Sequence, residues 1–152
     1  MSLKVKMMTA KEVDSGLLAE LHQKCFYRGW FWEEFENYLK NPSIQFWSVS
    51  QDQKLVGFLL LMVIIEEGEL LTFCVDPACQ NQGIGRKLLE AVVETFRMNC
   101  GKEILLDVAE NNASARKLYD SLGFEPFAIR NQYYRYANGV FEDAVVMRLK
   151  IK

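Results

Sequence analysis

One stretch of the chain decides the fold, and it reads Val75-Asp76-Pro77-Ala78-Cys79-Gln80-Asn81-Gln82-Gly83-Ile84-Gly85-Arg86. A hydrophobic strand, residues 70–75, runs into it, and an amphipathic helix with apolar side chains at residues 88, 89, 92, 93 and 96 leaves it. Because Gly83 and Gly85 lack side chains, a ligand can approach the backbone closely where loop becomes helix. The free N–H groups and the helix dipole favour a phosphate or pyrophosphate there, and Arg86 adds a charge-assisted contact.

Two common phosphate-binding loops are absent from this stretch. It has no G-x-x-x-x-G-K-[ST], the loop of nucleoside triphosphatases, and no G-x-G-x-x-G, the dinucleotide fingerprint. Two glycines alone would also suit a loop that merely turns the chain, so the identification depends on the residues around them.

Working outward from the loop, strands and helices alternate along the chain. We expect strands at residues 4–8, 44–49, 55–65, 70–75, 104–109, 124–130 and 140–149. Helices are expected around the apolar stripe Leu17, Leu18 and Leu21, at residues 33–39, after Gly85 and at residues 113–122. The order β-α-α-β-β-β-α-β-α-β-β predicts an α/β (α+β) fold, a mixed sheet with helices on both faces.

Length and charge narrow the class of protein. The 152 residues fit one domain spanning residues 1–152, and the formal charge of -2 argues against binding to nucleic acid or to an anionic membrane. The longest apolar run, residues 55–65, is too short to span a bilayer, and the N-terminus shows no export signal. We therefore expect a soluble cytoplasmic protein.

The cysteines and the single histidine argue against a metal site. The cysteines form no C-x-x-C pair, and His22 alone would have to complete a zinc site or activate a cysteine nucleophile. We expect no metal, a packed or surface position for His22, and four reduced, mostly buried thiols: Cys25, Cys74, Cys79 and Cys100.

Two motifs in order resemble those of the GNAT acetyltransferases. Gln80-x-x-Gly83-x-Gly85 after a hydrophobic strand is similar to the family's pyrophosphate-binding motif. Residues 106–124, LDVAENNASARKLYDSLGF, resemble the second family motif, which usually ends L-Y-x-x-x-G-F. The resemblance implies the GNAT fold, a mixed and mostly antiparallel central sheet flanked by helices, with acetyl-CoA as co-substrate.

The resemblance also implies where acetyl-CoA binds. In the family, amides of a β-bulge in the strand before the loop hold the pantetheine arm and the acetyl carbonyl, which places these contacts at Phe73, Cys74 and Val75. Asn112 matches an asparagine that hydrogen-bonds coenzyme A, and Tyr119 matches a tyrosine near its sulfur. The coenzyme A phosphates would lie against Gln80, Asn81, Gln82, Gly83, Ile84, Gly85 and Arg86.

Acetyl transfer needs a base for the amine and an acid for the departing thiolate. A thiol titrates near ~8.5 and a tyrosine near ~10, so Tyr119 is a workable acid. The family's proposed base is usually a glutamate at the position of Asp107, where aspartate is one methylene shorter. Asp107 shares a strand face with Leu105 and Ala109. It is either a base acting through a water or a structural carboxylate, and Glu110 is the fallback base.

The closest subfamily resemblance is to the ribosomal-protein-alanine N-acetyltransferases (RimI-like enzymes). Arg130-x-x-Tyr133-Tyr134, Gly139 and residues 142–147, EDAVVM, resemble their C-terminal signature. This implies a protein or peptide N-terminal amine as acceptor, with a ribosomal protein as one case. An α-amine has a pKa of ~8, compared with ~10.4 for a lysine side chain, so a weaker base can deprotonate it. Lysine side chains, a small-molecule amine and a non-catalytic coenzyme A-binding module remain alternatives.

Several of these residues also have a purely structural interpretation. Tyr119 lies on an apolar helix stripe with Ala115 and Leu122, and Asn112 is a plausible helix N-cap. Seven aromatic residues around the second helix predict core packing for most of their rings, with some left to line an acceptor groove together with Tyr133 and Tyr134. They are Phe26, Tyr27, Trp30, Phe31, Trp32, Phe35 and Tyr38.

Overall fold

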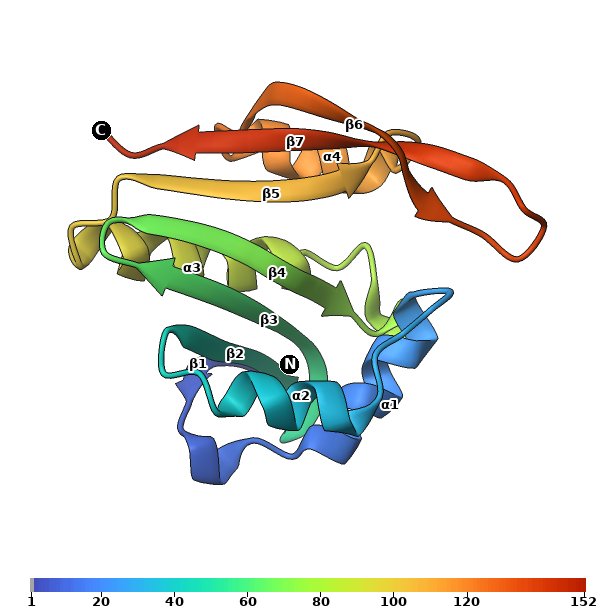
Figure 1. The fold of residues 1–152 in the computed structure, drawn as a ribbon. Helices are drawn as coiled ribbons and strands as arrows, with labels where there is room; N and C mark the ends of the chain where they lie inside the picture. The colour runs from blue at the N-terminus through green and yellow to red at the C-terminus, as the bar shows by residue number, and fades with distance from the viewer. Residues whose placement is uncertain (1) are drawn as a thin grey trace.

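The computed structural model describes residues 2–152 and is built on a seven-stranded sheet of order β1-β2-β3-β4-β5-β7-β6 (Figure 1). The strands are β1 (Leu3–Met8), β2 (Ile44–Gln51), β3 (Lys54–Ile64), β4 (Glu67–Val75), β5 (Glu103–Ala109), β6 (Glu125–Arg135) and β7 (Phe141–Lys150). The α-helices are α1 (Ser15–Cys25), α2 (Trp32–Leu39), α3 (Ile84–Met98) and α4 (Ala113–Ser121), and two short 3-10 helices are η1 (Ala10–Glu12) and η2 (Pro77–Cys79).

The sheet is mixed and mostly antiparallel, as the sequence predicts. Every adjacent pair of strands is antiparallel except β4 and β5, which run parallel. Those two strands pair only from Glu67 opposite Glu103 to Glu69 opposite Leu105. Beyond this point the two strands diverge, so their carboxyl-terminal halves are not paired with each other and a gap separates the two backbones in the middle of the sheet (Figure 1).

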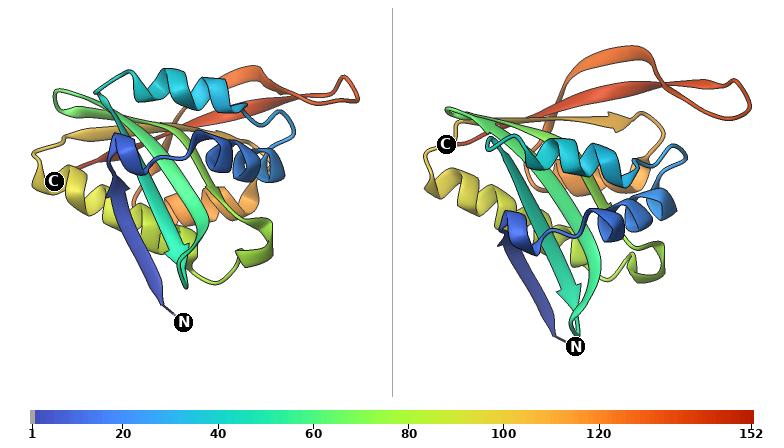
Figure 2. Two further views of the ribbon diagram at one scale, coloured as in Figure 1. Left: turned by 90° about the horizontal axis from the view of Figure 1, so that it is seen from below. Right: turned by 60° about the horizontal axis from the view of Figure 1, so that its bottom comes forward.

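The helices cover both faces of the sheet (Figure 2). Successive residues of β3 point to opposite faces, so Phe58 and Leu60 pack with α1 and α2, while Leu59 and Leu61 pack with α3 and α4. A strand buried on both faces reads as a continuous apolar run, which explains the unbroken stretch in β3. No helix in the described part of the chain is long and apolar enough to cross a membrane.

The structure corrects three details of the predicted elements. The strand expected at residues 70–75 is longer, because β4 already begins at Glu67. Leu17 does not belong to the buried stripe of α1, since it is 46% exposed while Leu18 and Leu21 are buried. The two 3-10 helices were not predicted, because three residues are too few to show a hydrophobic period.

The aromatic residues around α2 are mostly not in the core. Phe35 alone is fully buried, and Trp30 and Tyr38 are half-buried. The other four are exposed: Phe26, Tyr27, Phe31 and Trp32. These rings were expected in the core. They are exposed because the α1–α2 loop, residues 26–31, extends past α1, and no other element of the described chain covers its outer side (Figure 1).

Candidate active site

The β-bulge that the resemblance implies is present in β4. Leu60 of β3 pairs with Thr72 and Leu61 pairs with Leu70, so Leu71 has no partner. The bulge therefore precedes Phe73 and Val75, the start and end of the predicted acetyl-CoA-binding segment, rather than lying within it.

The ladder to β3 determines which main-chain groups of β4 face the gap. The Asp76 N–H donates to the Val56 carbonyl of β3 at 2.7 Å, so the Val75 carbonyl, across the same trans peptide, points away from β3. Alternation along an antiparallel ladder then directs the main-chain groups of Cys74 toward β3 and those of Phe73 and Val75 into the gap. Of the three predicted residues, Phe73 and Val75 thus direct main-chain groups into the gap, and the N–H of Val75 rather than its carbonyl is left for a ligand.

Two side chains already reach the Val75 carbonyl. The Cys25 thiol of α1 donates to it with a sulfur–oxygen distance of 3.3 Å, and the Gln80 amide donates to it at 3.1 Å. Gln80, the first residue of the predicted pyrophosphate motif, therefore connects its own loop to the end of β4 by a hydrogen bond.

The two motif glycines are needed for different reasons. Gly83 is the N-cap of α3 with a positive φ of 78°, and a Cβ there would touch nothing within 4 Å. A Cβ on Gly85 would lie 3.2 Å from the Phe73 ring, so this glycine lets α3 pack closely against β4. Gly83 serves the loop conformation and Gly85 serves helix packing, which refines the expectation that both simply admit a ligand. No side chain caps the start of α3, and its first-turn N–H groups point out of the helix end.

Arg86 and Asn112 hold α4 in place. The Arg86 guanidinium donates to the Ser121 hydroxyl at 2.5 Å and so ties the start of α3 to the end of α4. The Asn112 side chain accepts from the Ala115 N–H at 3.1 Å, which confirms the N-cap interpretation. Both side chains are exposed, at opposite ends of α4, and their contacts with coenzyme A stay predictions.

Tyr119 lies at the inner end of the gap. Its ring contacts Phe73 of β4 at 6.4 Å and Phe124 at 5.7 Å between centroids, and the residue is 6% exposed. Burial, followed by the nearby Tyr134, raises the pKa of its hydroxyl. The hydroxyl is therefore protonated near neutral pH and can act as a proton donor.

Asp107 is paired rather than free. The Arg130 Nε of β6 donates to Asp107 Oδ1 at 3.0 Å, and the carboxylate raises the pKa of this guanidinium. Arg130 also lies over the Tyr133 ring, 5.5 Å from its centroid. Asp107 shares its half-buried strand face with Leu105 and Ala109, as alternation predicts.

Sequence patterns did not separate Tyr134 from its neighbour Tyr133. Tyr133 is 51% exposed, whereas Tyr134 is half-buried. Burial raises the pKa of Tyr134, with smaller contributions from Asp107 and other neighbours. Tyr134 therefore joins Asp107 and Tyr119 in the site, whereas Glu110 is exposed at the end of β5.

The family follows from comparison with known proteins. Residues 16–124 match the Acetyltransferase (GNAT) family. The chain belongs to this family. This acetyltransferase is 31% identical over 143 residues to the [Ribosomal protein bS18]-alanine N-acetyltransferase of Haemophilus ducreyi, covering 93% of this chain and 97% of the relative. It is 38% identical over 103 residues to the Escherichia coli K12 enzyme of the same name, covering 68% and 69%.

A solved structure agrees with the family and the fold. The ribosomal-protein-S18-alanine N-acetyltransferase from Escherichia coli superposes with a TM-score of 0.91 at 28% identity, over 99% of this chain and 95% of that one. Together these findings show an acetyl-CoA-dependent N-acetyltransferase with the GNAT fold.

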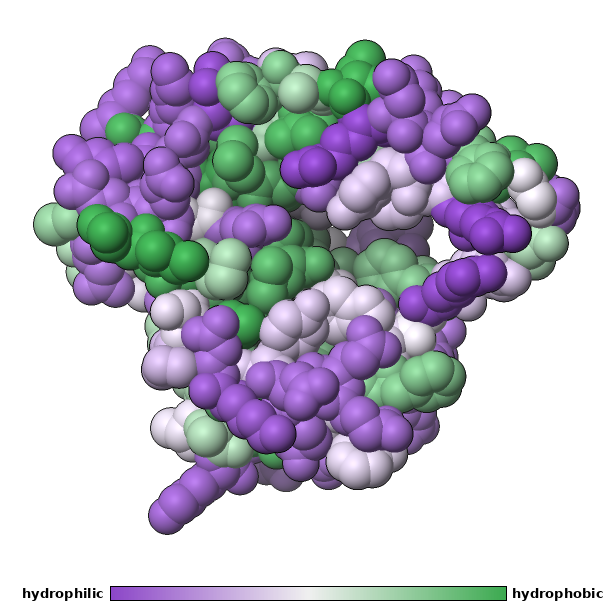
Figure 3. All heavy atoms as spheres, in the orientation of Figure 1, coloured by the Kyte–Doolittle hydropathy of each residue, from purple (hydrophilic) through white to green (hydrophobic). Residues whose placement is uncertain are grey.

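Two further segments of the acetyltransferase meet near the gap. The α1–α2 loop presents Tyr27, whose ring lies 6.4 Å from that of Tyr136 on the β6–β7 hairpin. Tyr136 donates to Glu142 at 2.6 Å, a bond that raises its pKa to about 12. The surface is hollowed beside the hairpin (Figure 3).

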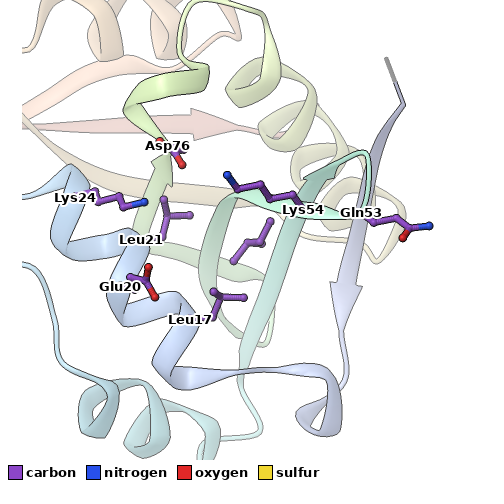
Figure 4. A pocket seen from close by; sticks show the side chains of 8 residues that line it. Leu17, Glu20, Leu21, Lys24, Gln53, Lys54 and Asp76 are labelled. Carbon is purple, nitrogen blue, oxygen red and sulfur yellow. The ribbon is translucent and has the colours of Figure 1, made fainter.

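A second hollow of about 360 Å³ lies outside this site, beside α1 (Figure 4). Lys24 and Lys54 point toward Asp76 there, and Leu17 and Leu21 form its apolar wall. Asp76 itself accepts from the Ala78 N–H at 3.0 Å. None of the predicted site residues lines this hollow, so it is separate from the predicted acetyl-CoA site.

The cysteines are free thiols with differing exposure. Cys74 is buried, Cys25 and Cys79 are half-buried, and Cys100 is exposed. The expectation of mostly buried thiols is therefore only partly right. Within the described residues, no cluster of three or more histidine, cysteine, aspartate or glutamate side chains is placed to hold a metal ion.

Proposed function

We propose that this acetyltransferase modifies the α-amino group at a protein N-terminus. The observation that carries the proposal is the gap between β4 and β5. It offers main-chain groups of Phe73 and Val75 on one side and the side chains of Asp107 and Tyr119 on the other. Relatives named [Ribosomal protein bS18]-alanine N-acetyltransferase are 31 to 38% identical to it over the aligned residues, so a ribosomal protein is the first acceptor to test.

In this proposal, acetyl-CoA binds with its phosphates at the end of the gap nearest α3. Its pyrophosphate lies against residues 80–86, where the positive end of α3 and Arg86 attract negative charge. The pantetheine arm follows β4 and bonds its exposed main-chain groups, so the thioester reaches the part of the gap beside Tyr119. Asn112 at the mouth of the gap contacts coenzyme A from the α4 side.

The acceptor nitrogen attacks the acetyl carbonyl, and a main-chain N–H of β4 stabilises the oxyanion that forms. The carbon–sulfur bond then breaks, and the coenzyme A thiolate takes the proton of the Tyr119 hydroxyl. Asp107 accepts the amine proton through a water, while Arg130 fixes one of its two oxygens. The acetyl group passes directly to nitrogen, with no covalent enzyme intermediate.

The acceptor end of the gap suits the terminus of an extended chain. The α1–α2 loop and the β6–β7 hairpin meet at the rings of Tyr27 and Tyr136, so a peptide that lies along this pair of rings directs its first residue toward Asp107. An α-amine with a pKa near ~8 is partly neutral at physiological pH, which fits a single paired carboxylate as base better than a lysine near ~10.4 does.

The test is acetyl transfer to a panel of amines, followed by coenzyme A release and intact peptide mass. The panel holds peptides with free Ala, Ser or Met termini, an N-blocked lysine peptide, and a polyamine. We expect a mass gain only on free termini. Transfer to the lysine peptide or the polyamine alone would show that the proposed acceptor is wrong and that acetyl transfer to an amine is right. Tight acetyl-CoA binding without any product would favour a non-catalytic binding module.

A further inference from the structure

His22 connects α1, the α1–α2 loop and β4 although the proposed chemistry does not use it. It is the single histidine of the chain and is 3% exposed. Its Nδ1 accepts the Trp30 N–H at 2.9 Å, and its Nε2 lies 2.8 Å from the Thr72 hydroxyl oxygen.

These contacts fix the tautomer of the ring. Because Nδ1 accepts from a backbone N–H, it carries no proton, and the neutral ring must then carry its proton on Nε2. Nε2 therefore donates to the Thr72 oxygen. One side chain thus holds a loop residue with one nitrogen and a β4 residue with the other.

Neighbouring contacts strengthen the same connection. The Gln23 amide donates to the Trp30 carbonyl at 3.3 Å, so α1 side chains hold both main-chain groups of this loop residue. On the β4 side, Cys25 donates to the Val75 carbonyl, one helical turn beyond His22. Thr72 and Val75 bracket Phe73, whose main-chain groups face the gap.

Packing alone would not require a histidine here. The His22 ring stacks on Trp30 at 4.7 Å and 20° and lies 4.4 Å from the Phe26 ring, contacts that a phenylalanine would also make. Unlike phenylalanine, an imidazole supplies a hydrogen-bond acceptor on one edge of the ring and a donor on the other. The two directed hydrogen bonds are therefore the distinguishing property of the residue.

We propose that His22 is a positioning residue that holds the α1–α2 loop against β4 and thereby sets the KM for the acceptor. The inference rests on the proposed function, since the loop must face the acceptor amine. It differs from a general role in stability because it predicts a selective effect on one of two substrates.

The experiment compares His22→Phe, His22→Asn and Thr72→Val with the unaltered enzyme, using the best amine from the panel above. His22→Phe keeps the ring stacking and removes both hydrogen bonds, so the acceptor KM should rise about tenfold, the equivalent of about one good hydrogen bond. His22→Asn places an oxygen near the position of Nδ1 and should recover part of the loss. Thr72→Val breaks only the β4 contact and should raise the acceptor KM by about two- to fivefold.

Throughout the series the acetyl-CoA KM should change by less than about twofold, since the ladder to β3 still holds β4 in place and the pyrophosphate loop is untouched. Thermal unfolding of each variant measures the structural cost separately. A wild-type acceptor KM in His22→Phe would overturn the proposal, as would equal rises in both KM values. If the unaltered enzyme acetylated no peptide terminus, the proposed acceptor would be wrong. The His22 variants would then be compared on the amine that the enzyme does acetylate.

Discussion

β4 and β5 border the same gap but contribute different chemistry to it. β4 offers the main-chain groups of Phe73 and Val75, and its side chains pack against α1 on one face and α3 on the other. β5 is paired along its whole length with β7 on the edge away from the gap, and it carries the titratable side chain of Asp107. In the proposed mechanism, β4 acts through its backbone and β5 through this carboxylate.

This difference predicts two kinds of sensitivity. On the β4 side, function depends on where the backbone lies, and hence on the Leu71 bulge and on the contacts that hold the strand. On the β5 side, it depends on the identity of single side chains, including Tyr119 of the adjoining α4. The predictions below test each side, beginning with the largest expected effect.

Tyr119→Phe should have the largest effect, because it removes the proton donor while keeping the ring. We expect kcat to fall by about 10²- to 10³-fold, the range of general acid catalysis, with little change in acetyl-CoA affinity. Steady-state kinetics and calorimetric titration of acetyl-CoA measure the two quantities. The matched control is Tyr134→Phe, which removes a hydroxyl from the same site and should cost less.

If Tyr134→Phe proved the more damaging variant, the acid would belong to β6 rather than α4. Tyr119 would then be a packing residue between Phe73 and Phe124, and its raised pKa would reflect burial alone. Retained kcat in both variants would exclude a tyrosine acid from the mechanism.

The second prediction tests the contacts that hold β4. Burial lowers the pKa of His22 from 6.5 to about 4. Above pH 6.5 the ring is neutral in the folded and unfolded states. As the pH falls below 6.5, the unfolded state binds a proton that the folded state does not, so stability is lost down to about pH 4.

The loss from this one group should reach at most about 2 kcal/mol at pH 5. Urea unfolding at pH 7.5 and pH 5.0 measures it, and the difference between the two pH values should shrink by that amount in His22→Phe. An equal acid sensitivity in both proteins would show that other groups are responsible, and that His22 is more solvated than the structure implies.

The third prediction concerns the carboxylate of β5. Asp107→Asn should lower kcat/KM about tenfold near pH 7 and progressively less above pH 8, where the α-amine is already neutral and needs no base. Arg130→Gln keeps the carboxylate and removes its partner, so it should preserve the pH profile. A uniform loss at every pH in Asp107→Asn would mark a structural carboxylate that holds Arg130 and the β6 strand.

The order of elements and the two faces of the sheet could be predicted because they follow from local periodicity. The unbroken apolar run of β3 and the stripe of α3 are properties of a few neighbouring residues, and both elements were predicted correctly. The order β5-β7-β6 and the divergence of β4 from β5 depend on pairing between distant segments, which a single sequence does not encode in any short pattern.

Within the site, types of residue were easier to predict than their partners. Asp107 was chosen from the family resemblance, but its ion pair with Arg130 spans 23 positions and left no local signal. His22 was expected to be merely packed or exposed, because nothing near it in the sequence indicates Trp30 and Thr72 as hydrogen-bond partners. The exposed aromatic residues of the α1–α2 loop were misjudged for the same reason.

The smallest expected effect returns to the β4 side and separates backbone strain from ligand contact. Gly83 and Gly139 have nearly equal positive φ values, 78° and 77°, and neither would bring a Cβ within 4 Å of another atom. Alanine at either position should therefore cost a similar amount of stability, about 1 kcal/mol, because each must hold a left-handed conformation.

Only Gly83 lies in the predicted pyrophosphate loop, whereas Gly139 lies at the tip of the β6–β7 hairpin. Gly83→Ala should therefore weaken acetyl-CoA binding by up to about fivefold, as the strained loop moves its N–H groups off the phosphates, and Gly139→Ala should leave that affinity unchanged. Gly83→Asn, whose side chain tolerates the left-handed region, should recover most of the loss. Equal acetyl-CoA affinities in the two alanine variants would mean that the backbone at Gly83 does not contact the phosphates, and the donor site would have to be sought along β4 alone.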